Sequence, residues 1–194
     1  EKVIGKKDHI TVARNIAQKS ITIVKDEEKL LPLKPEKIDS LGHLILSLDE
    51  GARGYLSTLS RDLNKTQGHV KEIFINNALS ELGRQDILNQ LDGVDQLIIS
   101  LVVRIRMDKG IATIDSTHSL LLDTLQKKGL PFITVSFGSP YLPDYNNLNT
   151  YICAYSYGSV SVQAVSDVLW GRASGTGILP IDLSPKYKRG MGEA

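Results

Sequence analysis

The feature that most constrains how this chain folds is the alternation of short apolar runs with longer amphipathic stretches. Most of the apolar runs are rich in Val, Ile and Leu at successive positions, which is typical of strands buried on both faces of a parallel sheet. The predicted strands are residues 21–24, 43–48, 70–75, 94–105, 131–137 and 150–155.

The stretches between these runs repeat apolar side chains at intervals of three and four residues, which predicts helices. Asp8, Ser80 and Asp115 each stand where a helix begins, and Asp8 is placed to accept hydrogen bonds from the first free amides. Gly93 and Gly129 stand where a left-handed residue would end a helix. The predicted helices are residues 8–20, a stretch beginning at 51, and residues 80–92, 115–128 and 159–170.

Strands that alternate with helices predict an α/β fold. We expect a three-layer sandwich with a mostly parallel sheet of roughly six strands, and six helices distributed over both faces. The whole chain, residues 1–194, is predicted to be a single domain. Within it, residues 1–34 form a lead-in helix and strand, and residues 171–194 form a glycine-rich turn and an extended tail.

Composition excludes several classes of partner. Lys and Arg together number 23 and Asp and Glu 22, so the formal net charge is +1 and favours neither nucleic acid nor an anionic membrane. No apolar run reaches the roughly 20 residues of a membrane span, and no charged-then-apolar leader opens the chain. Because the first residue is Glu1, we expect a soluble piece of a longer protein, although tag removal or natural processing would look the same.

The glycine-rich stretch GRASGTGILPIDL, residues 171–183, raises the question of a phosphate loop. In phosphate-binding loops the glycines follow a strand and open a helix, whereas here they follow a predicted helix and enter an extended segment. The stretch also has no Gly-Lys-Ser/Thr. We therefore expect a helix end at Gly171 and a polar turn that lets residues 179–183 lie along a sheet edge or leave the domain.

The sequence also lacks the residue patterns typical of catalytic nucleophiles and of metal ligands. The lone Cys153 lies in an apolar run and is expected to be buried, and no Gly-x-Ser-x-Gly elbow is present. The four histidines have no paired spacing, and His118 shares a helical stripe with leucines, so we expect it to be a hydrogen-bonded core residue. No cofactor and no metal are expected. The serines at 136, 139, 159 and 161 are predicted to make turns and helix caps.

A ligand site in an open parallel sheet lies beyond the carboxyl ends of its strands. The segment RIRMDKG, which begins at Arg104, is the strongest candidate because four charges follow a buried strand within six residues. A solvated surface loop is the alternative. The polar groups predicted at this edge are Asp49, Glu50, Arg104, Arg106, Asp108, Lys109, Ser139, Tyr141 and Asp144.

Three stretches, in this order, resemble the C-terminal domain of glycoside hydrolase family 3. Residues 9–33, HITVARNIAQKSITIVKDEEKLLPL, resemble the helix, strand and LLPL that follow the catalytic barrel. Residues 135–145, VSFGSPYLPDY, resemble the strand and G-x-P-Y loop of the β-N-acetylhexosaminidase branch. Residues 151–183 resemble the strand, helix and G-x-LP tail of that branch, in which the glycines shape the chain and bind no phosphate.

The resemblance implies that the chemistry lies outside this chain. Family 3 enzymes are retaining glycosidases whose Asp nucleophile lies on an N-terminal (β/α)₈ barrel, for which this chain has no room. The β-glucosidase branch carries an acid/base Glu after a central strand, but this chain has Arg104 and Arg106 there and no Glu. The other branch keeps its acid/base pair on the barrel. We therefore assign no catalytic residue, although Asp108 is the carboxylate nearest to the missing Glu.

The resulting interpretation is an accessory domain of a family 3 enzyme, with β-N-acetylglucosaminidase as the implied activity. Its partners would be the barrel and a glycan at the interface, and export to the periplasm or outside the cell would suit the longer protein. Two alternatives are a stand-alone module that binds a carbohydrate or other small ligand, and a β-glucosidase-type domain that contributes cleft residues. A third alternative, a flavodoxin-like nucleotide-binding domain, is supported only by analogy with the predicted fold. Residues proposed to contact substrate or barrel are Arg104, Arg106, Asp108, Lys109 and Tyr141.

Overall fold

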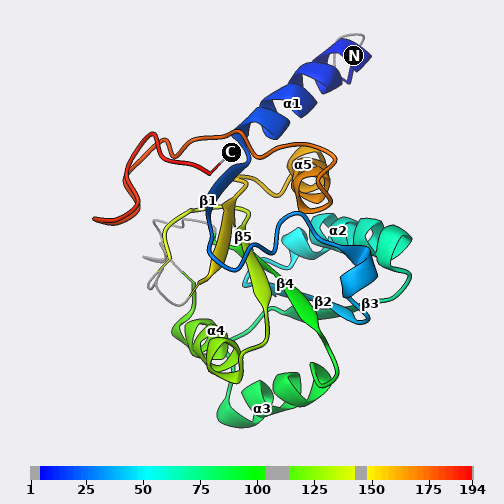
Figure 1. Cartoon of the computed structure of the whole chain (residues 1–194), viewed down its shortest axis with the longest axis vertical. Coiled ribbons are helices and arrows are strands. Elements are labelled where there is room, and N and C mark those ends of the chain that lie inside the picture. Colours follow the sequence, from blue (N-terminus) through cyan, green and yellow to red (C-terminus); the bar gives the residue numbers. More distant parts are fainter. Residues whose placement is uncertain (1–4, 104–113, 143–147, 194) are drawn as a thin grey trace.

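The structure is a computed structural model that describes residues 5–103, 114–142 and 148–193. These residues form one six-stranded sheet with the strand order β1-β6-β5-β4-β2-β3 (Figure 1). The strands are β1 (Thr22–Asp26), β2 (Leu41–Ser47), β3 (Val70–Ile75), β4 (Gln96–Val102), β5 (Phe132–Ser136) and β6 (Thr150–Cys153). The helices are α1 (Lys7–Ser20), α2 (Gly51–Gln67), α3 (Glu81–Gln90), α4 (Ser116–Lys128) and α5 (Ser159–Leu169), with a short 3-10 turn, η1 (Pro35–Lys37).

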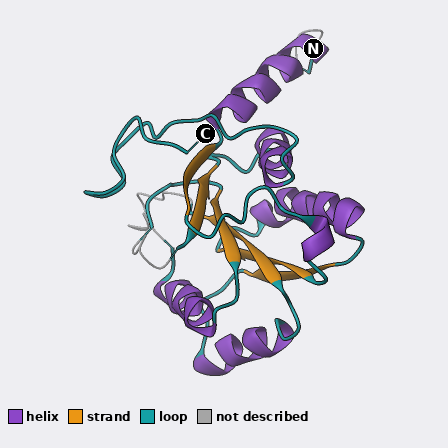
Figure 2. Ribbon diagram, in the orientation of Figure 1, coloured by secondary structure: helices purple, strands orange, loops and turns teal. Residues whose placement is uncertain are grey.

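The predicted three-layer α/β architecture is confirmed. All strand pairs are parallel except that of the edge strand β1 with β6, which is antiparallel. Helices cover both faces of the sheet (Figure 2). Six helices were predicted for the whole chain, and the described residues hold five α-helices and the η1 turn.

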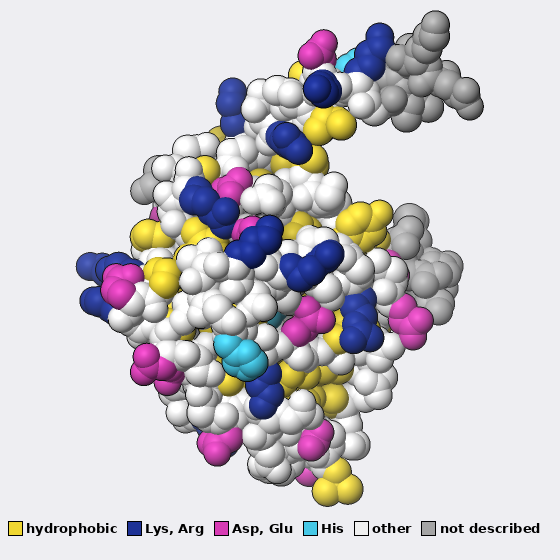
Figure 3. Space-filling model, turned by 90° about the vertical axis from the view of Figure 1, so that its right-hand side faces the viewer, with side chains coloured by type: hydrophobic (Ala, Val, Ile, Leu, Met, Phe, Trp, Pro, Cys, Tyr) yellow, Lys and Arg dark blue, Asp and Glu magenta, His cyan; other side chains and the backbone are white. Residues whose placement is uncertain are grey.

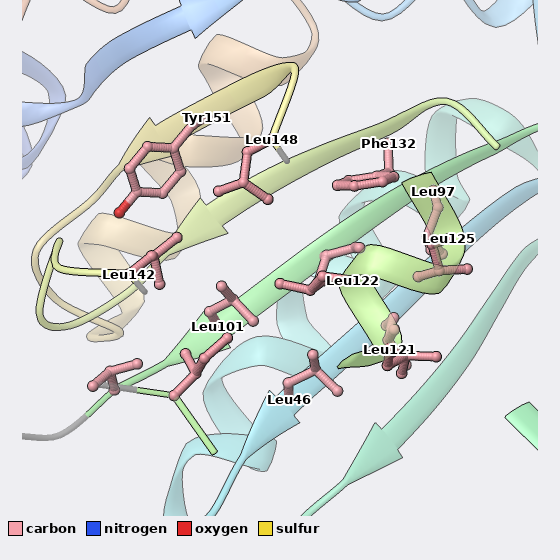
Figure 4. Close-up of a cluster of buried hydrophobic side chains, with 14 of the residues drawn as sticks. Leu46, Leu97, Leu101, Leu121, Leu122, Leu125, Phe132, Leu142, Leu148 and Tyr151 are labelled. Carbon is pink, nitrogen blue, oxygen red and sulfur yellow. The ribbon is translucent and has the colours of Figure 1, made fainter. Parts of the chain in front are cut away.

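Each face of the sheet has its own hydrophobic core, because successive side chains of a strand point to opposite faces. On β2, Leu44 and Leu46 join the core under α3 and α4, whereas Leu41 and Ile45 join the core under α2 and α5. Figure 4 shows the first of these cores, with leucines of α4 packed over β2 and β4. The central strands β2, β4 and β5 are therefore buried at every position.

The helix ends test the predicted caps. The Ser80 and Asp115 side chains accept from the amides of the first helical turn, and Gly129 ends α4 in the left-handed conformation, as predicted. The prediction for Asp8 was wrong: α1 begins one residue earlier, at Lys7, so Asp8 lies inside the first turn and no side chain caps the helix. The third helix ends at Gln90, before Gly93, which instead takes a positive φ in the following turn.

Helix α1 extends away from the body of the domain (Figure 1). Only Ala17 on it is buried, while Val12 and Ile16 are 56% and 64% exposed. Figure 3 shows acidic and basic side chains interspersed over one face of the molecule, which agrees with the near-neutral formal charge. Among the described helices, none combines the length and the apolar character that crossing a bilayer requires.

The glycine-rich segment runs along the edge strand β1. Gly171 adopts φ +66° directly after α5, and Thr176 pairs with Thr22 of β1 in an antiparallel bridge. A Cβ on Gly177 would lie 2.5 Å from the Ser20 carbonyl oxygen, so only glycine permits this approach. The glycines therefore serve backbone packing against the sheet, and the helix ends where predicted. The contacts with β1 are made by Thr176 and Gly177, whereas in residues 179–183 the Leu179 and Leu183 amides donate to the carbonyls of Met191 and Tyr187.

Candidate functional site

The candidate site lies at the carboxyl ends of the parallel strands, where the segments after β4, β5 and β6 surround a hollow of about 500 Å³. This is where a sheet of this topology places ligands. The hollow is open to solvent, and none of its described lining residues carries a formal charge. These residues are Val103, Phe137, Gly138, Ser139, Pro140, Tyr155, Ser156, Tyr157 and Gly158.

At the floor of the hollow, the backbone segment that follows β4 and the one that follows β5 approach each other closely. The Ser139 amide donates to the Val103 carbonyl oxygen at 2.9 Å. A Cβ on Gly138 would lie 2.3 Å from that oxygen, so a side chain here would force one of the two backbone segments to move. The Ser136 hydroxyl donates to the Ser139 carbonyl at 2.6 Å and stiffens the turn.

Tyr155 lies two residues beyond the end of β6, and its φ of +58° is uncommon for a residue with a side chain. Its hydroxyl donates to the Thr22 hydroxyl at 3.0 Å, which ties this wall of the hollow to β1. Burial raises the pKa of the Tyr155 phenol to about 12, so it is neutral at physiological pH. Strained residues of this kind persist only where neighbouring contacts fix them.

A second tyrosine connects the hollow to the start of α2. The Tyr157 hydroxyl donates to a carboxylate oxygen of Asp49 at 3.3 Å, and its ring meets Tyr55 edge-on with centroids 5.9 Å apart. The other oxygen of Asp49 accepts from the Gly51 amide at 3.0 Å. Asp49 is thus held in place by backbone and side-chain donors, and Leu48, Tyr55 and Tyr141 expose apolar surface around it and the hollow.

The sequence-predicted site residues are brought together in part. Asp49, Ser139 and Tyr141 do lie at the carboxyl edge of the sheet, and Tyr141 is 42% exposed. Arg104, Arg106, Asp108, Lys109 and Asp144 lie outside the described residues. The first four follow Val103, which lines the hollow.

Sequence reasoning offered Tyr151, Tyr155 and Tyr157 as possible stacking residues of a carbohydrate-binding module, with the core as the alternative for at least some of them. The alternating pattern of residues 150–157 left open which tyrosines are core, and the structure buries Tyr151 completely while leaving the other two at the hollow. The available signal was their position directly after a strand that ends at the ligand-binding edge.

The remaining chemically suggestive side chains are structural. Cys153 is fully buried, and burial raises its pKa to about 12, so it is not a nucleophile. The His118 ring donates to the Asn77 carbonyl at 2.9 Å, as expected for a hydrogen-bonded core histidine. Within the described ranges no three His, Cys, Asp or Glu side chains gather as metal ligands.

Comparison with solved structures identifies the fold. No protein-family model and no curated relative matches the chain. The β-glucoside phosphorylase BglX is 25% identical, with a TM-score of 0.69 over 92% of this chain and 32% of its own. A family 3 β-N-acetylglucosaminidase from Paenibacillus is 20% identical, with a TM-score of 0.70 over 93% of this chain and 34% of its own.

A β-glucosidase from Listeria innocua is 15% identical and has a TM-score of 0.77 over 94% of this chain and 28% of its own. The chain therefore spans about a third of the length of the structures that it matches. The chain therefore has the fold of an α/β domain that lies within larger chains, among them a glycoside hydrolase family 3 enzyme, as the resemblance implied.

Proposed function

We propose that this chain is the accessory α/β domain of a longer family 3 glycoside hydrolase of the β-N-acetylglucosaminidase branch. The observation that carries the proposal is the uncharged, tyrosine-rimmed hollow at the carboxyl edge of a sheet whose structural matches are about three times longer. In this role the edge packs on a (β/α)₈ barrel and borders the glycan cleft. The longer chain would hydrolyse O-glycosyl bonds with retention.

The surface chemistry supports an interface at this edge. Leu48 and Tyr55 are 48% and 47% exposed where β2 leads into α2, and Tyr141 lies after β5. Exposed aromatic and aliphatic side chains around a concave surface are typical of interfaces. In this role Tyr141, Arg104, Arg106, Asp108 and Lys109 contact the glycan or the barrel.

The proposed division of labour makes the isolated chain inactive. Retaining hydrolysis requires two carboxyl groups roughly 5–5.5 Å apart, one of them a free nucleophile. At the described part of this edge, the Asp49 carboxylate accepts from the Gly51 amide and the Tyr157 hydroxyl, and Glu50 accepts from Asn76 at 3.0 Å. In this proposal the two carboxylates are held by these hydrogen bonds beside the start of α2 and do not act as such a pair.

The test measures nitrophenyl N-acetylglucosaminide and nitrophenyl glucoside turnover by the chain alone and with a separately expressed barrel. Activity only with the barrel, and only on the N-acetyl substrate, supports the proposal. Turnover by the chain alone refutes it. Running each assay with and without phosphate distinguishes hydrolysis from phosphorolysis, which one structural match carries out according to its name.

A matched pair of variants tests the docking face. Leu48→Glu places a charge at the proposed interface and is expected to lower the affinity for the barrel at least about tenfold. Leu82→Glu changes the 83% exposed Leu82 on α3 and should leave that affinity unchanged. Equal effects of the two variants would contradict docking through the carboxyl edge.

A stand-alone carbohydrate-binding module is the second candidate, favoured by the exposed ring of Tyr55 beside Tyr157. Calorimetry with N-acetylglucosamine and chito-oligosaccharides decides between the two. Sub-millimolar binding by the chain without a barrel would favour the module.

A further inference from the structure

Helix α1 has an apolar side that the rest of the described chain leaves largely uncovered. At about 100° per residue, all the Ala, Val and Ile side chains of the helix fall within one half of its circumference. Of these, Ala17 is the only buried one, whereas Ile10, Val12 and Ile16 are exposed. A helix in a folded protein normally buries such an apolar side against another element.

A groove of about 550 Å³ separates this helix from the start of α5, and we call it the α1 groove. Ile10 and Ala13 of α1 and Val160 of α5 supply its apolar walls. Figure 3 shows α1 projecting over a recess in the surface, with hydrophobic side chains on the underside of the helix. The residues that line the α1 groove are Gly5, His9, Ile10, Ala13, Arg14, Ser159, Val160 and Gln163.

The α1 groove adjoins the hollow at the carboxyl edge of the sheet. Gly158, the residue before α5, lines the hollow, and the next two residues, Ser159 and Val160, line the groove. A partner that covers the hollow can therefore continue over the first turn of α5 and onto α1.

The charges on α1 indicate the chemistry of the surface that would cover it. Residues 5–20 carry four basic side chains and one acidic side chain, so their formal net charge is +3 with the histidine neutral. The basic residues are Lys6, Lys7, Arg14 and Lys19, and the acidic one is Asp8. Arg14 is the only formally charged residue in the lining of the groove. An apolar surface with surrounding acidic groups complements this helix, whereas a second α1 would bring more positive charge.

We propose that the apolar side of α1 is a second docking face for the (β/α)₈ barrel, separate from the carboxyl edge, and that the barrel surface against it is apolar and acidic. This inference rests on the proposed function. About two thirds of the length of the matched structures lies outside the part that this chain covers, which is enough chain to cover both faces.

Docking on the barrel should also stabilise α1 as a helix. Its 14 residues are about the length at which an isolated helix is marginal in water, and no side chain caps its beginning. Ala17 alone anchors it by burial, whereas most residues of α5 are buried. We therefore expect amides 10–14 to exchange faster than those of α5 in the chain alone, and at least about tenfold more slowly once the barrel is bound.

The affinity for the separately expressed barrel tests the contact with three variants. Ile16→Glu places a carboxylate on the apolar side and should lower that affinity at least about tenfold. Arg14→Gln should lower it about threefold at about 0.05 M salt and less at about 0.5 M. Leu120→Glu changes a half-exposed leucine of α4, on the opposite face of the sheet, and is the matched control that should bind as the unchanged chain does.

The outcomes separate this inference from the proposed function. Barrel binding that Leu48→Glu weakens but Ile16→Glu does not, with unchanged amide exchange in α1, overturns the α1 contact and leaves the proposed function standing. Absence of any barrel binding by the unchanged chain refutes both. Stronger binding by Arg14→Gln overturns the acidic character of the barrel surface.

Two other occupants are tested with the chain alone. Self-association in sedimentation that Ile16→Glu abolishes would assign the apolar side to a second copy. Binding to phosphatidylserine vesicles that slows amide exchange in α1 would assign it to a membrane surface. Either result overturns docking of α1 on the barrel.

Discussion

Lowering the pH from 7 to 5 should destabilise this fold, because His43 is buried as a neutral imidazole. The residue lies on β2 with no exposed surface, and burial lowers its pKa from 6.5 to about 4, although the nearby Glu72 carboxylate opposes that shift. Below pH 6.5 the unfolded chain therefore binds a proton that the folded chain rejects.

The hydrogen bonds around His43 fit the neutral ring. The Ser60 hydroxyl donates to Glu72, so the Ser60 oxygen is free to accept from Nδ1–H of His43 at 2.6 Å. The Ser100 hydroxyl, 2.7 Å from Nε2, can then donate to the ring. A second ring proton would replace the acceptor at Nε2 with a donor and break this arrangement.

The size of the effect follows from the two pKa values. The contribution of neutral His43 to the free energy of unfolding is fully present above pH 6.5. It falls as the pH drops below the unfolded pKa of 6.5 and stops falling near the folded pKa of about 4. Between pH 7 and pH 5 the loss amounts to about 2 kcal/mol in the free energy of unfolding. For a domain of this size that lowers Tm by roughly 4–8 °C.

Urea unfolding of the chain and of His43→Gln at pH 7, 6 and 5 measures the effect. The variant should be less stable at pH 7, because the buried network is disturbed, but its stability should fall less with pH. The carboxyl groups with lowered pKa values, Asp62, Asp115 and Asp182, titrate below this window. Equal pH slopes for the two proteins would refute the argument from His43.

Three further predictions concern the candidate site and the core. Gly138→Ala should cost about 2 kcal/mol because its Cβ would meet the Val103 carbonyl oxygen, whereas Gly54→Ala, in open space on α2, should be neutral or slightly stabilising in the same denaturation assay. Tyr157→Phe should cost about 1 kcal/mol and loosen the start of α2, seen as faster amide exchange; unchanged exchange would show that the bond to Asp49 is unimportant. Cys153 should resist thiol reagents at pH 8 until the chain unfolds, and rapid labelling of the folded chain would contradict its burial.

The strands, most helix ends and the layered architecture were predictable from the sequence because their causes are local. Apolar periodicity decides which residues form β4 or α4, and the Ser80 and Asp115 caps act within a few residues of themselves. Asp8 shows the limit of such reasoning. The helix starts at Lys7, so the N-cap residue is Lys6 and Asp8, although suited to capping, lies two positions too late.

Only the tertiary structure decided which side chains meet. Tyr157 reaches Asp49, Tyr155 reaches Thr22, and His43 reaches Ser100, across sequence separations that no local pattern encodes. Lys25 looks like an ordinary strand lysine until a bulge and a distant tail bury it. Sequence periodicity specifies which face of an element is apolar, whereas burial, charge and the shape of a hollow depend on elements that the fold brings beside it.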